Sequence, residues 1–372
     1  MTVQELKSAF TFAYNQKPDA IYFAPGRINL IGECFAKFDD AVLPTVLSFG
    51  IYLMLRKNNG KHTKFWSLNE PESIDCEINK PIQKPVNSWI KHPLIVFNQL
   101  IDSGIELESG YDMLFWGNIP NGVALSPSEG LEIVTAFALD DQLGELYNNK
   151  NSSAFIQNNK HNFSFINWDI IQLNPPIEIY ESIAIKMEHV KIIISNTHTP
   201  HKFEVSPYYQ RISECKSAFE YLNKIRPLYD LDGFTGEEFN SMISTIDNPT
   251  AIKSVYHIIS EVYRTKKAAI ALKEGDLTLF GLLMNASHES LRDNLDIVSP
   301  EVDSMVAQAW KIDGVIGSRM TGCGLGGCTI SLVREEVIDI FIEKVGTAYE
   351  SQTGIKPEFY IAEIGDSACK LK

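Results

Sequence analysis

The sequence lacks several features that mark secreted, membrane-spanning or nucleic-acid-binding proteins. No two cysteines have the Cys-x-x-Cys spacing, and no apolar run approaches the ~20 residues needed to cross a bilayer. Lysine and arginine number 33 against 47 acidic residues, so the net charge of −14 opposes binding to nucleic acid or to an anionic membrane. The first residues have neither the basic start nor the apolar core of a signal peptide. We therefore expect a cytoplasmic protein with reduced thiols and without a zinc site.

The sequence does contain β-favouring apolar runs that alternate with segments of helical periodicity. Apolar residues make up 44% and charged residues 22%, a composition typical of globular proteins. The pattern predicts strands over 48–56, 111–116 and 190–195, and helices over 128–146, 212–225, 252–272 and 277–292. The glycine-rich segment 314–332 is expected to close as a turn between a helix and the strand 328–332. We infer an α/β or α+β protein, with a polar loop near 147–160 and a boundary between two halves near 173–176.

A ten-residue stretch near the N-terminus is the most informative motif. It reads Ala-Pro-Gly-Arg-Ile-Asn-Leu-Ile-Gly-Glu over 24–33, and Val-Leu-Pro follows at 42–44. The stretch resembles the galactokinase signature, which continues with His-Thr-Asp-Tyr-Asn-Gly-Gly before Val-Leu-Pro. Here Cys-Phe-Ala-Lys-Phe-Asp-Asp fills positions 34–40. The scaffold part of the motif is therefore intact, and the part that would hold a sugar is altered.

A second motif, Gly-Asn-Ile-Pro-Asn-Gly-Val-Ala-Leu-Ser-Pro-Ser-Glu-Gly-Leu-Glu, spans 117–132. It resembles the galactokinase loop Pro-x-x-x-Gly-Leu-Ser-Ser-Ser-Ala, which runs into a helix whose N-terminus holds a triphosphate. The resemblance implies phosphate contacts from Gly122, Ser126 and Ser128, and a weak metal contact from Ser128 if Mg-ATP binds. Glu129 stands at the alanine and places a carboxylate where an anion should bind, so we expect Mg-ATP to bind weakly or not at all. A simple capped helix would give the same pattern.

A third motif, Gly-Ser-Arg-Met-Thr-Gly-Cys-Gly-Leu-Gly-Gly-Cys over 317–328, matches the glycine-rich galactokinase loop at all its fixed positions. Glycines at this density allow positive φ angles and close approach of the backbone to a ligand or a neighbouring loop. The resemblance implies that Gly322 and Gly324 lie beside the phosphates. Further matches within 195–211, 257–266 and 285–303 extend the resemblance over nearly the whole chain.

The resemblance as a whole identifies the chain as a member of the GHMP (galacto-, homoserine, mevalonate, phosphomevalonate) kinases. It implies an α+β protein with the GHMP kinase fold. A ribosomal-S5-like N-terminal domain would cover 1–180 and a ferredoxin-like C-terminal domain 181–372, with the last strand returning to the first domain as an option. The ligand cleft would lie between the two domains.

The same resemblance assigns a sugar-binding site in which some polar groups are missing. Glu33, Cys34, Ala36 and Tyr208 fall on the positions that contact the sugar. Cys34 stands for a histidine and Ala36 for the aspartate that grips the sugar, and both changes remove polar recognition of hydroxyl groups. On the adenine side, Val86 replaces the stacking tryptophan. The sugar and adenine sites are therefore both expected to be weakened.

The catalytic positions are also altered. Arg27 keeps the place of the family's catalytic arginine. An ungapped count places Gln172 at the position of the catalytic base, where a glutamine amide cannot carry a proton away. If the count is off by three residues, Asp169 is the base instead. The sequence is therefore compatible both with a degenerate catalytic site and with a displaced catalytic base.

Three functions are compatible with these motifs. The first is a non-catalytic or very weak galactokinase-like protein, a pseudoenzyme that binds sugar or nucleotide as a sensor or regulator and needs no cofactor. The second is an active kinase that converts ATP and galactose to ADP and galactose 1-phosphate with Mg-ATP, using Asp39, Asp40, Asp169 or Glu129 as a displaced acid. The third, a structural subunit of a true galactokinase, has no supporting sequence feature. The expected ligands are a small-molecule sugar and, as an option, ATP, and the expected state is a monomer or weak oligomer.

Overall fold

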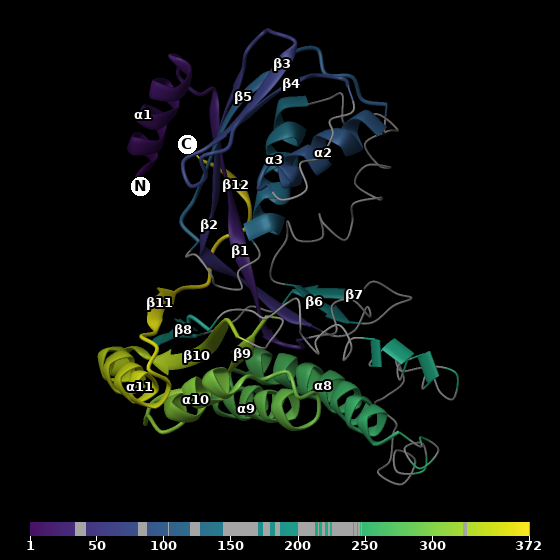
Figure 1. Ribbon diagram of the computed structural model, residues 1–372, viewed down its shortest axis with the longest axis vertical. Coiled ribbons are helices and arrows are strands. Elements are labelled where there is room, and N and C mark those ends of the chain that lie inside the picture. The colour runs from purple at the N-terminus through teal and green to yellow at the C-terminus, as the bar shows by residue number, and fades with distance from the viewer. Residues whose placement is uncertain are drawn as a thin grey trace.

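A computed structural model describes most of the chain in two connected halves. The described residues are 1–33, 42–80, 88–102, 104–119, 127–143, 170–173, 179–182, 187–199, 248–322 and 326–371, with isolated residues between 213 and 246. Each half has its own sheet and its own helices, which lie above and below each other in Figure 1. This segregation of helices and mostly antiparallel strands is that of an α+β protein.

The first half is built on a six-stranded sheet. Its strands, in spatial order, are β12 (Cys369–Leu371), β1 (Ala20–Ile31), β2 (Leu43–Lys57), β5 (Tyr111–Gly117), β3 (His62–Ser67) and β4 (Ile74–Glu77). Neighbouring strands pair antiparallel except β3 and β5, which pair parallel. The last strand of the chain therefore lies at the edge of the first sheet, beside β1 (Figure 1).

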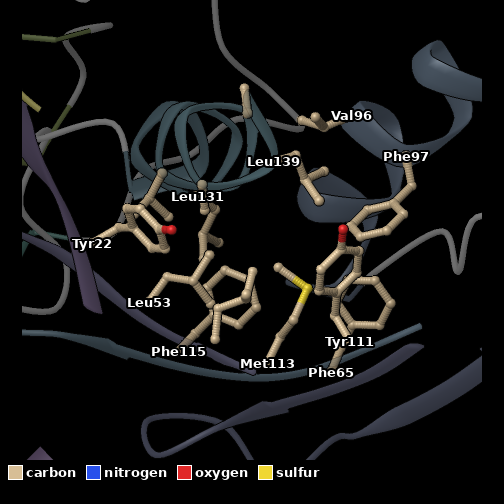
Figure 2. Packing of buried hydrophobic residues seen from close by; sticks show 14 of the residues in the cluster. Tyr22, Leu53, Phe65, Val96, Phe97, Tyr111, Met113, Phe115, Leu131 and Leu139 are labelled. Atoms are coloured by element: carbon tan, nitrogen blue, oxygen red, sulfur yellow. The ribbon is translucent and has the colours of Figure 1, made fainter. Parts of the chain in front are cut away.

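Helices cover both faces of this first sheet. On one face lie α2 (Lys91–Asp102) and α3 (Pro127–Leu143), and α1 (Val3–Tyr14) lies on the other (Figure 1). Figure 2 shows the core between the sheet and helices α2 and α3, where buried side chains interdigitate. The labelled members of this core are Tyr22, Leu53, Phe65, Val96, Phe97, Tyr111, Met113, Phe115, Leu131 and Leu139. Burial of this much apolar surface holds α3, and with it the second sequence motif, in place.

The second half is built on a four-stranded antiparallel sheet. Its strands are, in order, β11 (Glu358–Ala362), β8 (Val190–Asn196), β10 (Cys328–Arg334) and β9 (Val315–Thr321). Of the helices that the structure describes, α8 (Pro249–Glu274), α9 (Leu277–Asp293), α10 (Pro300–Ala309) and α11 (Ile338–Thr353) pack along it. The short 3₁₀ turn η5 (Glu335–Val337) precedes α11. A separate pair of strands, β6 (Ile170–Leu173) and β7 (Ile179–Ser182), completes the described elements.

Most of the predicted elements are confirmed, and one is wrong. The strands expected over 48–56, 111–116 and 190–195 lie within β2, β5 and β8, and the helices expected over 252–272 and 277–292 lie within α8 and α9. Helix 128–146 is α3, described as far as Leu143. The third motif, however, connects two strands and not a helix and a strand, because 315–321 pairs with 328–334. The helix over 212–225 and the loop over 147–160 lie wholly or largely outside the described residues, as does most of the expected boundary at 173–176.

Helix α9 approaches β9 so closely that one glycine cannot be replaced without moving the backbone. A Cβ atom at Gly281 would lie 1.9 Å from the carbonyl oxygen of Ile316. We expect Gly281→Ala to lower the free energy of unfolding by about 1–3 kcal/mol, despite the higher helix propensity of alanine. Gly346→Ala is the matched control in α11, because the atoms nearest to its Cβ would be side-chain atoms, of Phe359 at 3.1 Å and of Pro357 at 3.9 Å. Urea unfolding of both variants checks this prediction. Equal urea midpoints for Gly281→Ala and Gly346→Ala would contradict it.

Candidate functional site

Strand β1 carries the first motif from one core into the other. Its early residues Tyr22 and Ala24 belong to the core of the first sheet, and its late residues Ile28 and Leu30 pack with the second sheet. The pairing with β2 shifts register between Pro25 and Arg27, and such bulges redirect side chains. Arg27 therefore stands at the junction of the two halves.

Arg27 meets the second motif through an ion pair with Glu129. The Nε atom of Arg27 lies 3.3 Å from Oε2 of Glu129, which sits in the first turn of α3. The arginine side chain is 13% exposed and the glutamate side chain 41%. The two motifs are thus brought together by charge, and the glutamate that seemed to face an anion faces a cation instead.

A cavity of about 370 Å³ opens beside the first turn of α3. Its apolar walls come from β2, β5 and α3, and the second motif lines it with Gly117, Ile119, Ser128 and Leu131. Gly130 lets the helix approach β2 here, since a Cβ atom would lie 3.0 Å from Cγ1 of Ile51. The lining residues are Ile51, Ser67, Asn69, Glu70, Ser88, Trp89, Lys91, His92, Phe115, Gly117, Ile119, Ser128 and Leu131. An apolar hollow with a few polar groups beside a helix N-terminus suits a ligand with a flat apolar part and an anionic part.

Trp89 is the cavity residue that sequence reasoning missed. Its ring centroid lies 5.3 Å from that of Phe115 in an edge-on contact, and its Nε1 atom donates a hydrogen bond to the carbonyl oxygen of Glu72 at 3.2 Å. An aromatic wall is therefore present although Val86, the position expected to hold it, is not aromatic and lies outside the described residues. The tryptophan three residues later in the sequence was the available indication.

Glu33 is buried and binds the third motif. Its Oε1 atom accepts hydrogen bonds from Oγ1 of Thr321 and from the backbone N–H of Gly322, both at 3.0 Å. Its Oε2 atom accepts from Asn29 at 3.2 Å, and the residue is 6% exposed. Gly322 has a φ of 83°, a conformation that favours glycine. The first and third motifs are therefore joined by the carboxylate that the family resemblance assigns to the sugar.

A second buried carboxylate joins the first motif to α8. Glu261 accepts hydrogen bonds at Oε1 from the backbone N–H of Gly32 at 3.1 Å and from Ser287 at 2.6 Å, and at Oε2 from Arg264 at 2.8 Å. Burial opposes its ionisation, but the Arg264 cation and the other polar contacts outweigh burial and lower the pKa of Glu261 below its ordinary value. Arg319 adds a fully buried cation that donates to the carbonyl oxygen of Asn29 at 3.2 Å.

The remaining predicted site residues stay predictions. The backbone of Gln172 lies in β6, where it pairs with Tyr180, and its side chain is not described. Seven other residues lie outside the described part of the chain: Cys34, Ala36, Gly122, Ser126, Asp169, Tyr208 and Gly324. Of the predicted residues, the structure thus brings together Arg27 with Glu129 and Glu33 with Gly322, and places Ser128 at the cavity.

Two negative findings apply to the described residues. Among them, no group of three or more His, Cys, Asp or Glu side chains is arranged to hold a metal ion. None of the described helices is long and apolar enough to cross a membrane.

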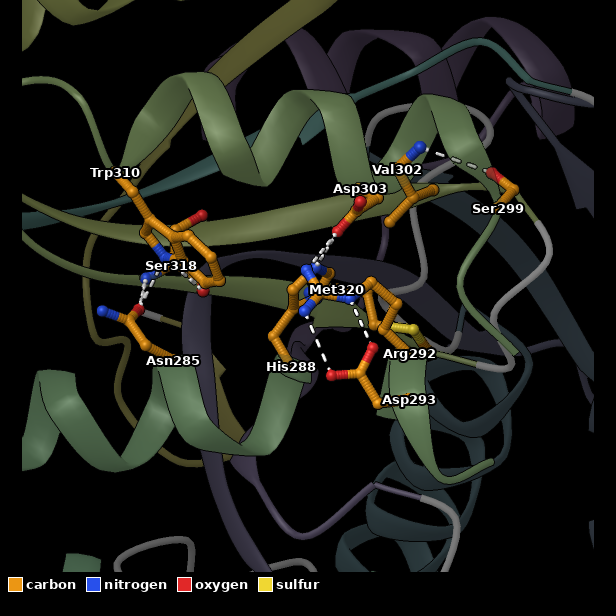
Figure 3. A network of polar contacts seen from close by, with 10 residues as sticks. All are labelled: Asn285, His288, Arg292, Asp293, Ser299, Val302, Asp303, Trp310, Ser318 and Met320. Atoms are coloured by element: carbon orange, nitrogen blue, oxygen red, sulfur yellow. Dashed lines mark hydrogen bonds and ion pairs between the residues drawn. The ribbon is translucent and has the colours of Figure 1, made fainter. Parts of the chain in front are cut away.

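A polar network behind the third motif holds His288 in its neutral form. Figure 3 shows His288 between α10 and β9: its Nδ1 atom accepts from the backbone N–H of Met320 at 3.1 Å, and Nε2 lies 3.2 Å from Asp303. Arg292 also donates to Asp303, at 3.1 Å. Because Nδ1 is an acceptor here, Nε2 carries the proton and donates to the carboxylate. Burial lowers the pKa of His288 to about 4, although Asp303 acts in the opposite direction.

We expect the protein to lose stability as the pH falls from about 6.5 to about 4. Burial also lowers the pKa of His257 to about 4, so over this range both histidines bind more protons in the unfolded chain than in the folded one. The loss should be on the order of 1–3 kcal/mol for each. Urea unfolding at several pH values checks this. His288→Asn should flatten the pH dependence, whereas His62→Gln, at an exposed position, should not; equal slopes in all three proteins would contradict it.

Comparisons with known proteins place the chain in a family. The family model described as "Galactokinase galactose-binding signature" matches residues 8–57, and that described as "GHMP kinases C terminal" matches 268–351. The galactokinase of Clostridium beijerinckii is 36% identical over 385 residues, which cover 99% of each chain. That of Enterococcus faecalis is 36% identical and covers 98% of this chain and 99% of its own.

Solved structures agree with these matches. The structure of Lactococcus lactis galactokinase complexed with galactose superposes with a TM-score of 0.87 at 30% identity and covers 100% of both chains. The mevalonate kinase of Methanococcus jannaschii shares the fold, with a TM-score of 0.64 at 16% identity over 93% of this chain and 98% of that one. The fold is thus the GHMP kinase fold, as the sequence resemblance implied, and the motifs that meet at Arg27 are those of a GHMP sugar kinase. Within that class, the chain belongs to the galactokinase family.

Proposed function

We propose that this protein is an active sugar kinase that transfers the γ-phosphate of ATP to galactose or a closely related hexose. The observation that carries the proposal is the cavity at the first turn of α3, one residue away from the Arg27–Glu129 pair. Full-length similarity to proteins named galactokinase supports it. Those comparisons give no support to the non-catalytic interpretation.

The cavity suits an adenine nucleotide. Trp89 and Phe115 offer an aromatic edge and Ile51 an apolar wall for a base, and the helix N-terminus with Ser128 offers free donors for phosphate. Glu129 is not among the lining residues, and its charge is offset by Arg27. The repulsion expected from the sequence is therefore reduced, and we propose Mg-ATP as the phosphate donor, with the Ser128 hydroxyl as a candidate magnesium contact.

The sugar would bind at the end of β1. The residues matched by the galactose-binding model include Arg27 and Glu33, and the L. lactis relative was solved with galactose. The Glu33 carboxylate already accepts three hydrogen bonds, so its direct grip on a sugar would need one of its remaining lone pairs. Cys34, Ala36 and Tyr208 are proposed to complete the sugar site.

The proposed domains follow the two sheets. A boundary near 180/181, within β7, would separate the segment that holds β1 to β6 from the segment that holds β8 to β11, and β12 pairs with the first sheet. The cleft between the domains would then contain the ion pair of Arg27 with Glu129.

Two assays on the purified chain test the proposed function. Thermal-shift titrations with galactose, glucose and Mg-ATP report binding, because a ligand of the folded state raises the unfolding midpoint. Hexose-dependent release of ADP reports transfer. Binding of both ligands with ADP release supports the kinase. Binding without ADP release for any hexose would overturn it in favour of the non-catalytic homologue, and the absence of any Mg-ATP response would overturn it as well.

The Trp89→Ala variant tests whether the cavity is the nucleotide site. Loss of the aromatic wall should weaken Mg-ATP binding on the order of tenfold and leave hexose binding unchanged. Trp66→Ala is the matched control, since Trp66 lies on β3, is 38% exposed and does not line the cavity. An equal loss of Mg-ATP affinity in both variants would argue against this cavity as the nucleotide site.

A further inference from the structure

We propose that Glu129 is the catalytic base of this protein, the carboxylate that takes the proton from the attacking sugar hydroxyl. The inference rests on the proposed kinase function and assigns a role that the sequence resemblance places elsewhere, at position 172. It follows from the contact of Glu129 with Arg27 and from the state of the other acidic groups around the site.

The geometry of Glu129 suits this role. Its Oε2 atom lies 3.3 Å from Arg27 Nε, is shielded from solvent and forms no hydrogen bond with the described residues. The side chain as a whole is 41% exposed, so a substrate can reach the carboxyl group from its solvent side. The neighbouring residue Ser128 lines the cavity, which puts the carboxylate beside the proposed phosphates.

The charge of Arg27 makes a carboxylate tolerable at this place. A lone anion beside a polyphosphate at a helix N-terminus would repel it. A guanidinium in direct contact offsets that charge and can also face the transferring phosphoryl group. The substitution that seemed to damage the phosphate loop therefore forms, with Arg27, a cation–carboxylate pair of the kind that phosphoryl transfer to an alcohol uses.

Among the carboxylates that the structure describes, the others near the three motifs already hold hydrogen-bond or ion-pair partners. Glu33 and Glu261 are buried and hold three hydrogen bonds each. Glu132, one turn further along α3, pairs with His92 at 2.8 Å. Gln172 has an amide, which cannot remove a proton. Glu129 is the described acid with free acceptor capacity beside Arg27.

The step balances without any further reactant. The sugar hydroxyl oxygen forms a bond to the γ-phosphorus, and the bond from that phosphorus to the β,γ-bridging oxygen breaks. ADP leaves with the electron pair of that bond. The hydroxyl proton passes to Glu129, which returns it to water after the product has left.

Steady-state kinetics of three variants test the proposal. Glu129→Gln keeps the shape of the side chain and its contact with Arg27 but removes the basic group, so kcat should fall about 10²–10⁴-fold with little change in the KM for Mg-ATP. The acidic limb of the kcat/KM pH profile should also disappear. The kcat of Glu129→Asp should fall less, because aspartate keeps the carboxylate charge and only shortens the side chain. Asp140→Asn, which removes an exposed carboxylate three turns further along α3, is the matched control and should behave as wild type.

The outcomes separate the two proposals. If wild type turns over and Glu129→Gln keeps more than roughly a tenth of kcat with the same pH profile, Glu129 is not the base although the kinase function stands. If wild type releases no ADP with any hexose, the kinase function and this role both fail. Thermal midpoints of the variants show whether each is folded. If Glu129→Gln is unfolded, a folded Glu129→Asp with the kcat of wild type would also overturn the role.

Discussion

The Glu261→Ala variant is expected to lose about 3–5 kcal/mol of its free energy of unfolding, which is a large fraction of the stability of an ordinary domain. The carboxylate is fully buried and accepts from the backbone of Gly32, from Ser287 and from Arg264. Its removal leaves three donors, one of them charged, without an acceptor in the interior. Because Gly32 lies in the first motif, the loss should also loosen the junction between the two halves.

Urea unfolding of Glu261→Ala and Glu261→Gln measures this effect. The glutamine variant keeps one acceptor oxygen and should lose less than the alanine variant. Glu274→Ala is the matched control, because Glu274 lies in the last turn of the same helix and is exposed. A loss below about 1 kcal/mol in Glu261→Ala would mean that water or a rearranged Arg264 replaces the carboxylate.

The elements of the fold could be predicted because their sequence patterns are local. The apolar run at 190–195 predicts a buried strand without reference to the rest of the fold. In α8, apolar residues spaced three and four apart define one helix face that must pack against other parts of the protein. The third motif was placed wrongly because glycines dominate its sequence. In strand 315–321 the residues Gly-Ser-Arg-Met separate Val315 and Ile316 from Thr321, and the segment becomes a strand through its pairing with β10 and its close contact with Gly281.

The candidate site was harder to predict because its contacts join distant positions. The motifs at 24–33 and 317–328 were recognisable, but no local pattern indicates that Glu33 accepts from Thr321, 288 residues away. The direction in which Glu129 points depends on the bulge at Arg27 and on the approach of α3 to β2, neither of which is visible in the sequence. Trp89 was overlooked because the family resemblance assigned the stacking ring to position 86, whereas a cavity needs only an aromatic ring that reaches it.

Arg27→Met is expected to lower kcat/KM for hexose-dependent ADP release by about 10²–10³-fold, because it removes the cation, at the junction of β1 and α3, that we propose stabilises the developing charge. Arg334→Met, which changes an arginine at the exposed end of β10, is the matched control and should behave as wild type. Because the Arg27 side chain is only 13% exposed, the variant should also lose stability, so its thermal midpoint must first show that it is folded at the assay temperature. A variant with more than half of the wild-type activity would contradict a role for this arginine in transfer.

The Arg27→Met, Glu129→Gln double variant then asks whether the pair acts as one unit. If Arg27 holds Glu129 in position and offsets its charge, each single change already disables the other residue. The double variant should therefore be about as slow as the slower single variant, and far from the product of the two separate losses. Losses that multiply would instead show two independent roles, with the 3.3 Å contact between the side chains incidental to catalysis. Because the two residues belong to different motifs, a strongly non-additive result would also show that the junction between β1 and α3 is where the sequence motifs become a catalytic site.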